Sequence, residues 1–202
     1  MMKALSRRVV LLVWAMALLC ACSRNAQLSM PPADRVSLQE GDLVCRLGVS
    51  WVSPFCARAA CHDARFSHMG ILVFHGKTPY VLHAELEETK GFDGIIEERL
   101  DEFIASARAY GIFRIPITPQ ESSLMIAHAR AEARKNPEFD TTFGINPQPG
   151  TVYCSQLVRE SLMEATGRRY PMVMINGEED SHEIDRVIKA PGVQEIFYQA
   201  QP

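Results

Sequence analysis

The residues that most constrain the fold form the run TVYCSQLV at Thr151–Val158, where a short β-branched segment passes directly into a helical pattern. Cys154 is therefore predicted at or just before the N-terminus of a helix, where free N–H groups and the helix dipole favour a thiolate. A thiolate is a nucleophile, so Cys154 is a candidate catalytic residue. A lone cysteine in such a place is more often a small buried residue, so a partner base is needed. The helical spacing is carried by Leu157, Val158, Ser161, Leu162 and Ala165, with Gly167 at the C′ position.

The candidate base is His68, in the sequence SHMGILVF at Ser67–Phe74. This run and Tyr80–Leu86 are predicted to pair as the two strands of a hairpin. Because side chains alternate along a strand, His83 and Glu85 share a face of the second strand. Either one is a candidate to fix the tautomer of His68, and His83 is the first choice.

Strand patterns cluster in the middle of the chain and helical patterns flank them, which predicts an α+β fold with a largely antiparallel sheet. The clearest helix begins with Thr118 as N-cap, Pro119 at N1 and Glu121 in a capping box, and it runs to Lys135. The segment Gly48–Arg65 is expected to be irregular. Further strands are expected at 43–46, 94–98, 113–117 and 194–198, and further helices at 101–110 and 185–189.

The first 21 residues combine a basic start, an apolar run and small residues, as in a secretory signal that is too short to span a bilayer. The run ends in LCAC at Leu19–Cys22, which resembles a bacterial lipobox and predicts that Cys22 is acylated. An ordinary cleaved signal is the alternative. Ser23, in place of an aspartate, favours the outer membrane. We therefore expect a signal at 1–21, a lipidated tether at 22–39 and one catalytic domain at 40–202.

Charge and cysteine content limit the partners. The chain has 21 Lys and Arg against 24 Asp and Glu without a basic cluster, which argues against a nucleic-acid partner. In an oxidising compartment two of Cys45, Cys56 and Cys61 can pair, and Cys56 and Cys61 are closest in sequence. A zinc site is the alternative that we favour less, because the spacing lacks a CxxC pair. Its ligands would be Cys56, Cys61, His62 and His68.

Together, SHMGI, VLHA, FDTTF and YCSQLV resemble the circularly permuted members of the NlpC-type papain-like superfamily, in particular the YaeF/YiiX-like group with its lipoproteins. The resemblance covers about Glu40 to Gly167. It implies a papain-like α+β fold in which the histidine strand precedes the cysteine helix. Cys154 then matches the nucleophile, His68 the base and His83 the third polar position, where many relatives have Glu, so that Glu85 is the alternative.

The resemblance implies hydrolysis of an amide bond through a thioester, without a cofactor or metal. The expected substrate is a peptide, cell-wall or lipid-derived amide or ester. Two alternatives remain open: a lipid acyl hydrolase or acyltransferase with the same dyad, and a non-catalytic envelope module that keeps the cleft. Specificity is expected in loops such as Gly48–Arg65 and Met172–Glu183.

Overall fold

The structure is a computed structural model of the whole chain, and it describes residues 28–50, 53–62, 64–87, 90–143, 146, 148–173 and 183–201. The predicted signal and the acylation site at Cys22 lie outside these residues, as does most of the expected loop Met172–Glu183.

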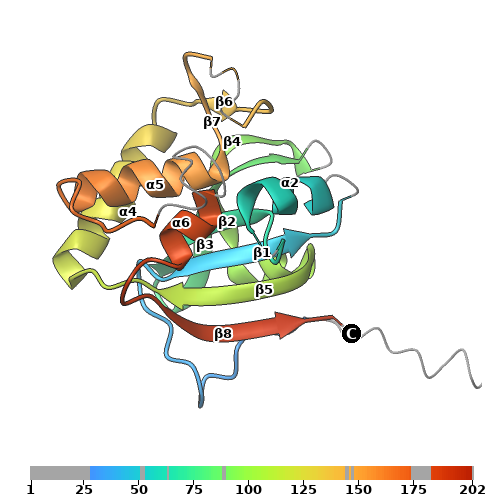
Figure 1. Cartoon of the computed structure of the whole chain (residues 1–202). Helices are drawn as coiled ribbons and strands as arrows, with labels where there is room; N and C mark the ends of the chain where they lie inside the picture. Colours follow the sequence, from blue (N-terminus) through green and yellow to red (C-terminus); the bar gives the residue numbers. More distant parts are fainter. Residues whose placement is uncertain are drawn as a thin grey trace, which may run out of the picture.

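A six-stranded sheet in the order β4-β3-β2-β1-β5-β8 forms the centre of the domain, and every neighbouring pair in it is antiparallel (Figure 1). A separate two-stranded parallel ladder joins β6 to β7 above β4. The strands are β1 Leu43–Gly48, β2 His68–His75, β3 Thr78–Glu87, β4 Phe92–Arg99, β5 Ala107–Arg114, β6 Glu138–Phe139, β7 Thr151–Val152 and β8 Gln194–Ala200.

Helices cover both faces of this sheet, and each face has its own apolar cluster. On one face α4 Pro119–Ala133 and α5 Cys154–Ala165 pack over side chains such as Met69 and Ile71 (Figure 1). On the other, α3 Leu100–Ala105 covers Val44, Leu72 and Val81. No helix in the described part of the chain has the length and hydropathy to cross a membrane. The remaining helices are α2 Ser53–Ala60 and α6 Glu183–Ile188.

The predicted fold class is confirmed, and so is the best-marked helix. Thr118 accepts a hydrogen bond from the backbone N–H of Glu121, whose carboxylate accepts the Thr118 N–H in return. Gly167 follows α5 with φ +57°, as a C′ residue should.

Three predicted elements differ. The strand expected at 113–117 is the end of β5, which runs from Ala107 to Arg114. The segment expected to be irregular contains α2, which has Pro54 in its first turn, where a proline costs no helical hydrogen bond. The helix expected at 101–110 ends at Ala105, and Ala107 already pairs with Gly48 of β1. Pairing with β1 overrides the helix propensity of this alanine-containing segment.

Part of the expected tether lies against the domain. Leu28 is buried in the α3-side cluster, the Ser29 N–H donates to Gln199, and the Tyr110 hydroxyl donates to the Ser29 carbonyl. Among the described residues, contact with the domain therefore starts at Leu28, within the expected tether, because this apolar side chain packs beside β5 and β8.

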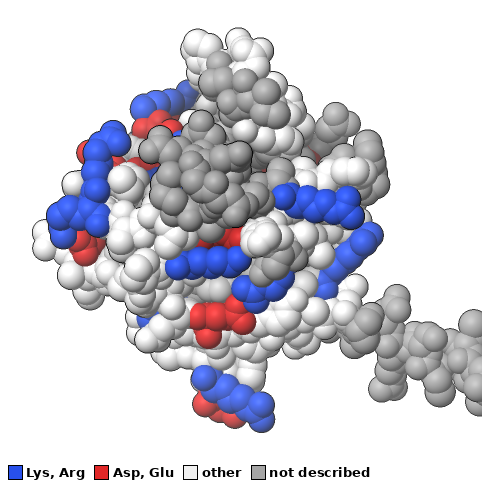
Figure 2. Space-filling view, in the orientation of Figure 1, with Lys and Arg blue, Asp and Glu red and all other residues white. Residues whose placement is uncertain are grey.

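Basic and acidic side chains are interspersed on the face shown in Figure 2, with no continuous field of one sign. Several are in ion pairs, such as Arg65 with Glu195 and Lys189 with Asp185. This mixture agrees with the small formal net charge of −3.

Candidate active site

Cys154 is the first residue of α5, after the extended N-cap residue Tyr153. The strand-to-helix junction predicted from the sequence is therefore confirmed. Helix α6 holds the start of α5 in place, because the Ser155 hydroxyl donates a hydrogen bond of 2.8 Å to the carboxylate of Glu183 at the start of α6. Arg159, one turn further along α5, holds the other oxygen of the same carboxylate at 3.1 Å.

The thiol of Cys154 is only 5% exposed, and this burial raises its pKa to about 12. Hydrogen bonds from the backbone N–H groups of Met69 and Ser155 act in the opposite direction but do not outweigh it. The resting group is a protonated thiol, contrary to the thiolate that the helix N-terminus alone would favour. The hydrogen bond with Met69 ties Cys154 to the backbone of β2 at the residue that follows His68.

His68 and His83 are in direct contact, with His68 Nε2 2.8 Å from His83 Nδ1 and the two rings perpendicular. The β2–β3 ladder ends at the pair Ile71–Leu82, and continuing its register would put His83 opposite Gly70 and Glu85 opposite His68. His83 therefore reaches His68 along the diagonal of the sheet, a distance that long side chains can bridge.

Gly70 makes this diagonal contact possible. A Cβ atom at position 70 would lie 2.8 Å from the Cβ of His83 and 2.5 Å from Val81, both closer than packed carbon atoms allow. A glycine here lets the His83 side chain pass over β2 toward His68.

Glu98 of β4 continues the same diagonal behind His83. Its Oε2 atom lies 3.6 Å from His83 Nε2, slightly longer than a hydrogen bond, and that nitrogen has no hydrogen-bond partner among the described residues. Although burial raises the pKa of Glu98, the contacts with His83 and Lys90 lower it to about 2. Lys90 approaches the other carboxylate oxygen at 2.5 Å. Glu98 is therefore ionised, and it lies on the far side of His83 from His68.

These contacts determine which ring nitrogen of each histidine carries its proton. An ionised Glu98 only accepts, so the proton of His83 belongs on Nε2, which faces it. His83 Nδ1 then accepts the Nε2–H of His68, which leaves the lone pair of His68 on Nδ1. A histidine in this tautomer can take a proton at Nδ1 and pass the resulting positive charge toward Glu98.

Both imidazoles are neutral at rest. Burial lowers the pKa of His83 to about 4, although Glu98 acts to raise it. Burial also lowers the pKa of His68 well below its usual value, and Arg46 and His83 add to the effect. The candidate nucleophile is therefore a protonated thiol at rest, and the candidate base is an uncharged imidazole.

Glu85 is held by Arg46 rather than by the histidines. The Arg46 guanidinium donates to Glu85, to the Phe103 carbonyl at 3.0 Å and to the Ser106 hydroxyl at 2.8 Å. Glu85 Oε2 lies 3.7 Å from His68 Nε2, too far for a hydrogen bond. Of the two candidates for the third position, the structure therefore brings His83 into contact with His68 and keeps Glu85 as a charged neighbour.

A cavity of about 310 Å³ opens beside His68. Its wall includes residues of the expected specificity segment, such as Val49 and Ser53, and the β6-side residue Phe139. Cys154 itself is not among the lining residues, in agreement with its burial. The candidate base therefore borders the cavity, whereas the candidate nucleophile is not part of its lining.

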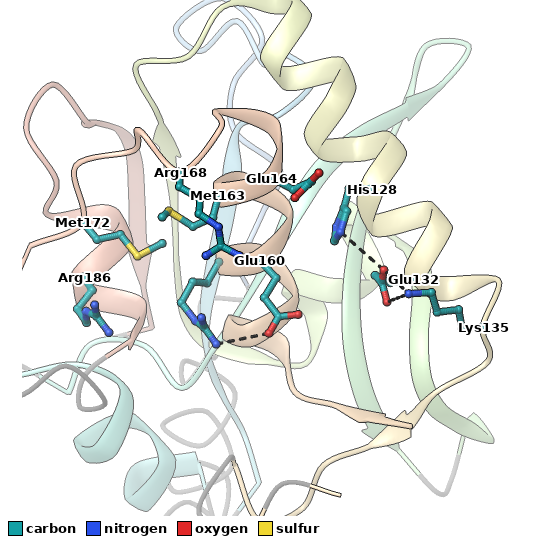
Figure 3. Close-up of a pocket in the computed structure, with 10 residues that line it drawn as sticks. His128, Glu132, Lys135, Glu160, Met163, Glu164, Arg168, Met172 and Arg186 are labelled. Atoms are coloured by element: carbon teal, nitrogen blue, oxygen red, sulfur yellow. Dashed lines mark hydrogen bonds and ion pairs between the residues drawn. The ribbon is translucent and has the colours of Figure 1, made fainter. Parts of the chain in front are cut away.

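A second cavity, of about 540 Å³, lies between α4, α5 and α6 and contains none of the predicted site residues (Figure 3). Its walls are mostly charged and partly paired, as in the contacts of Glu132 with His128 and Lys135. The close-up shows Met163 and Met172 pointing toward one another beside Arg168 and Arg186. None of the described residues that line this cavity is a cysteine, serine or threonine nucleophile paired with a base.

Cys45, Cys56, Cys61 and Cys154 form no disulfide bond with one another, so Cys56 and Cys61 are not paired in the structure. The alternative zinc ligands Cys56, Cys61 and His62 do not join His68 in a cluster with ligand spacing. Within the described residues, the group with such spacing is His68, His83 and Glu85, whose donor atoms lie within 4.8 Å of one another.

Glu98 and Arg46 are the site residues that sequence reasoning missed. Glu98 was recognised as part of a strand, but its place depends on the register that pairs Val81 with Glu98. Glu98 shares one face of β4 with Ile96 and Gly94 and is only 4% exposed, and an acidic side chain buried in this way requires a partner of opposite charge.

Comparison with known proteins agrees with this fold. The structure resembles the metalloprotein YiiX from Escherichia coli O157:H7, with a TM-score of 0.57 and 20% sequence identity over 81% of this chain and 97% of that one. A search of curated protein sequences gave no match. The sequence profile of the family described as "Permuted papain-like amidase enzyme, YaeF/YiiX, C92 family" matches residues 38–190. The chain thus belongs to the permuted papain-like amidases of the YaeF/YiiX type, a family of cysteine hydrolases.

Proposed function

We propose that this protein is a lipid-anchored hydrolase of the cell envelope that cleaves an amide bond, with Cys154 as nucleophile, His68 as base and His83 as the residue that orients it. The observation that carries the proposal is the 2.8 Å contact between His68 and His83, with the Cys154 thiol next to Met69 on the same strand.

The chemistry follows from the neutral resting state. As Sγ of Cys154 attacks the carbonyl carbon of the substrate, its proton passes to Nδ1 of His68. The imidazolium is stabilised through His83 by Glu98, and it then protonates the leaving amine as the C–N bond breaks. Water attacks the thioester with the same base, which releases the acid and restores the thiol.

The test is to trap the thioester. Incubating the purified protein with cell-envelope extract and quenching in acid should leave an acyl group on the peptide that contains Cys154, detected by mass spectrometry. The Cys154→Ala variant should show no adduct and no turnover, and His68→Ala should lose activity with a normal fold. Since the two residues act as a unit, losses in the double variant should be far from additive. Turnover that survives in Cys154→Ala refutes the mechanism.

The envelope location is supported by the sequence at Leu19–Cys22, which has the form of a lipobox after an apolar run. Acyl chains on Cys22 would anchor the domain without a spanning helix. The outer membrane is the proposed destination because Ser23 follows Cys22.

A second candidate function is metal binding at His68, His83 and Glu85, whose donor types suit zinc. The similar protein YiiX is described as a metalloprotein. A metal on His68 Nε2 would remove the N–H that His83 accepts, so this use and the hydrolytic one exclude each other. Zinc that inhibits and a chelator that restores turnover would support the hydrolase, whereas turnover that depends on added zinc would support the metal enzyme.

A further inference from the structure

The cavity between α4, α5 and α6 has no role in the proposed hydrolysis, yet it is larger than the cavity beside His68. Its volume is about 540 Å³, against about 310 Å³, and this is in the range of sites that bind small organic molecules. What it can bind depends on which of its charges are already paired. Its lining includes four basic side chains, which are Lys135, Arg159, Arg168 and Arg186, and three acidic ones, which are Glu132, Glu160 and Glu164.

Two of the four basic side chains already have carboxylate partners. Lys135 donates to both oxygens of Glu132, at 2.7 and 2.8 Å. Arg159 donates to Glu183 over 3.1 Å and lies 3.6 Å from Glu160. These two cations are therefore satisfied within the protein.

Arg168 and Arg186 form no ion pair with the described residues. The Nε atom of Arg186 is buried and has no hydrogen-bond partner, and a buried donor left in this way is costly unless a ligand supplies an acceptor. Arg168 has φ +60°, in the left-handed region that long side chains rarely adopt. Backbone strain of this kind is typical of functional sites.

The two unpaired arginines lie beside apolar groups and apart from the carboxylates. Figure 3 shows Arg168 and Arg186 on the side of α5 that carries Met163 and Met172. Glu164 is on the other side of α5, toward α4, where His128, Glu132 and Lys135 are also drawn. One half of the cavity therefore combines two positive charges with the surface of two thioethers.

From these observations we infer that this half of the cavity binds the phosphate group of an organic ligand, on Arg168 and Arg186. A guanidinium can donate two parallel hydrogen bonds to phosphate oxygens. A phosphate ester offers three such oxygens and up to two negative charges, which two arginines can share, whereas one carboxylate offers two oxygens and a single charge. Because the cavity exceeds the size of one phosphate, the organic part lies against Met163 and Met172, whose flexible side chains adapt to it.

Calorimetric titration of the purified full chain, in phosphate-free buffer with about 0.15 M salt, tests this site. Glycerol 3-phosphate should bind with a Kd below about 1 mM. Glycerol should not bind, and succinate should bind at least about tenfold more weakly. Glycerophosphoglycerol, the headgroup part of phosphatidylglycerol, distinguishes two sources of the phosphate. Equal or tighter binding of this diester would indicate a phospholipid headgroup, and weaker binding would indicate a soluble phosphate ester.

Matched variants locate the site. Arg168→Asn and Arg186→Met should each weaken the binding of glycerol 3-phosphate by about ten- to a hundredfold, since each removes a charge-assisted contact. Asn is chosen because it tolerates the left-handed backbone, and Arg168 is exposed, so this variant should fold normally. Arg134→Gln is the control, because Arg134 is also exposed but does not line the cavity. Its affinity should match that of the unchanged protein.

Three results would overturn the inference. The first is that neither phosphate compound binds. The second is that binding survives unchanged in Arg168→Asn and Arg186→Met, or falls equally in Arg134→Gln, because the anion would then respond to overall charge. The third is that succinate binds as tightly as glycerol 3-phosphate. The hydrolytic mechanism is untouched by any of these results, since none of the substituted residues takes part in it.

Discussion

His68 and His83 meet across two strands on a diagonal of the sheet, and Glu98 of β4 extends that diagonal by one more strand. His83 lies two residues along β3 from the position directly opposite His68, and Glu98 lies two residues along β4 from the position directly opposite His83. Because Gly70 has no side chain, nothing at that position blocks the contact between His68 and His83. The arrangement places a carboxylate behind a pair of neutral imidazoles, so that a row of polar side chains spans three strands.

This geometry predicts which residue orients the base. His83→Ala should lower turnover by about 10²- to 10⁴-fold, because His68 then loses the acceptor that fixes its tautomer. Glu85→Ala should have a much smaller effect, and His83→Glu should retain measurable activity. The check is kcat/KM of the three variants side by side. A crippled Glu85→Ala with a mildly affected His83→Ala would move the role to Glu85.

Glu98 should act through His83 rather than on the substrate. In Glu98→Gln the imidazolium formed on His68 is less stabilised, so kcat should fall by about tenfold or more and the acidic limb of the pH profile should move to lower pH. Glu98→Asp should recover part of the loss. Glu97→Gln is the control, since Glu97 pairs with Arg130 instead. An unmoved acidic limb in Glu98→Gln would leave Glu98 with a structural role.

The lowered pKa values predict how the protein responds to acid. The pKa of His83 is about 4 in the fold against 6.5 ordinarily, and that of Glu98 is about 2 against 4.5. Between the folded and the ordinary pKa of each group, the unfolded chain binds more protons than the folded chain. The free energy of unfolding should therefore decrease as the pH falls from about 6.5 toward 2. Thermal unfolding across this range measures it, and the loss below pH 4.5 should be smaller in Glu98→Gln. The acidic limb of kcat/KM should lie below 6.5, because the pKa of His68 is lowered too.

Gly70→Ala should damage activity beyond its cost in stability. The added Cβ collides with His83, Val81 and the Leu82 carbonyl, a clash worth about 1–3 kcal/mol, and it pushes the imidazole away from His68. Gly76→Ala serves for comparison, because its backbone has φ +64° but nothing lies within 4 Å of the new atom. It should lose stability and keep turnover. Equal kcat in the two variants would contradict the role of Gly70.

The proposed anchor is tested at one position. Cys22→Ala should block acylation and release the protein from outer-membrane fractions, because the chain then lacks the thiol that carries the lipid. Fractionation with metabolic labelling by a clickable palmitate measures both effects. Cys22→Ser checks that loss of the thiol, rather than of a small side chain, is responsible. Unchanged labelling and membrane partition in either variant would rule out this lipidation.

Local sequence patterns predicted the elements that carry the site. The strand-to-helix junction at Cys154, the hairpin with His68 and His83, and the capped helix from Pro119 all depend on periodicity and turn residues close in sequence. The third position was predicted from resemblance and alternation, and contact between the two histidines agrees with it.

Long-range pairing accounts for what the sequence did not predict. The position of Glu98 depends on the β3–β4 register, and the shortening of the helix at Ala105 depends on pairing of Ala107 with Gly48. The raised pKa of Cys154 reflects burial by segments distant in the chain, which outweighs the local field of the helix start. Likewise, Leu28 was assigned to a tether because nothing near it in sequence reveals the site beside β5.

Burial of the Cys154 thiol has a consequence for its survival in an oxidising environment. Peroxide attacks the thiolate, and with a pKa of about 12 very little of the sulfur is ionised between turnovers. Oxidation to sulfenic acid should therefore be slow between turnovers. In the proposed mechanism, the sulfur becomes reactive only while a substrate carbonyl draws its proton toward His68, so the substrate itself activates the nucleophile.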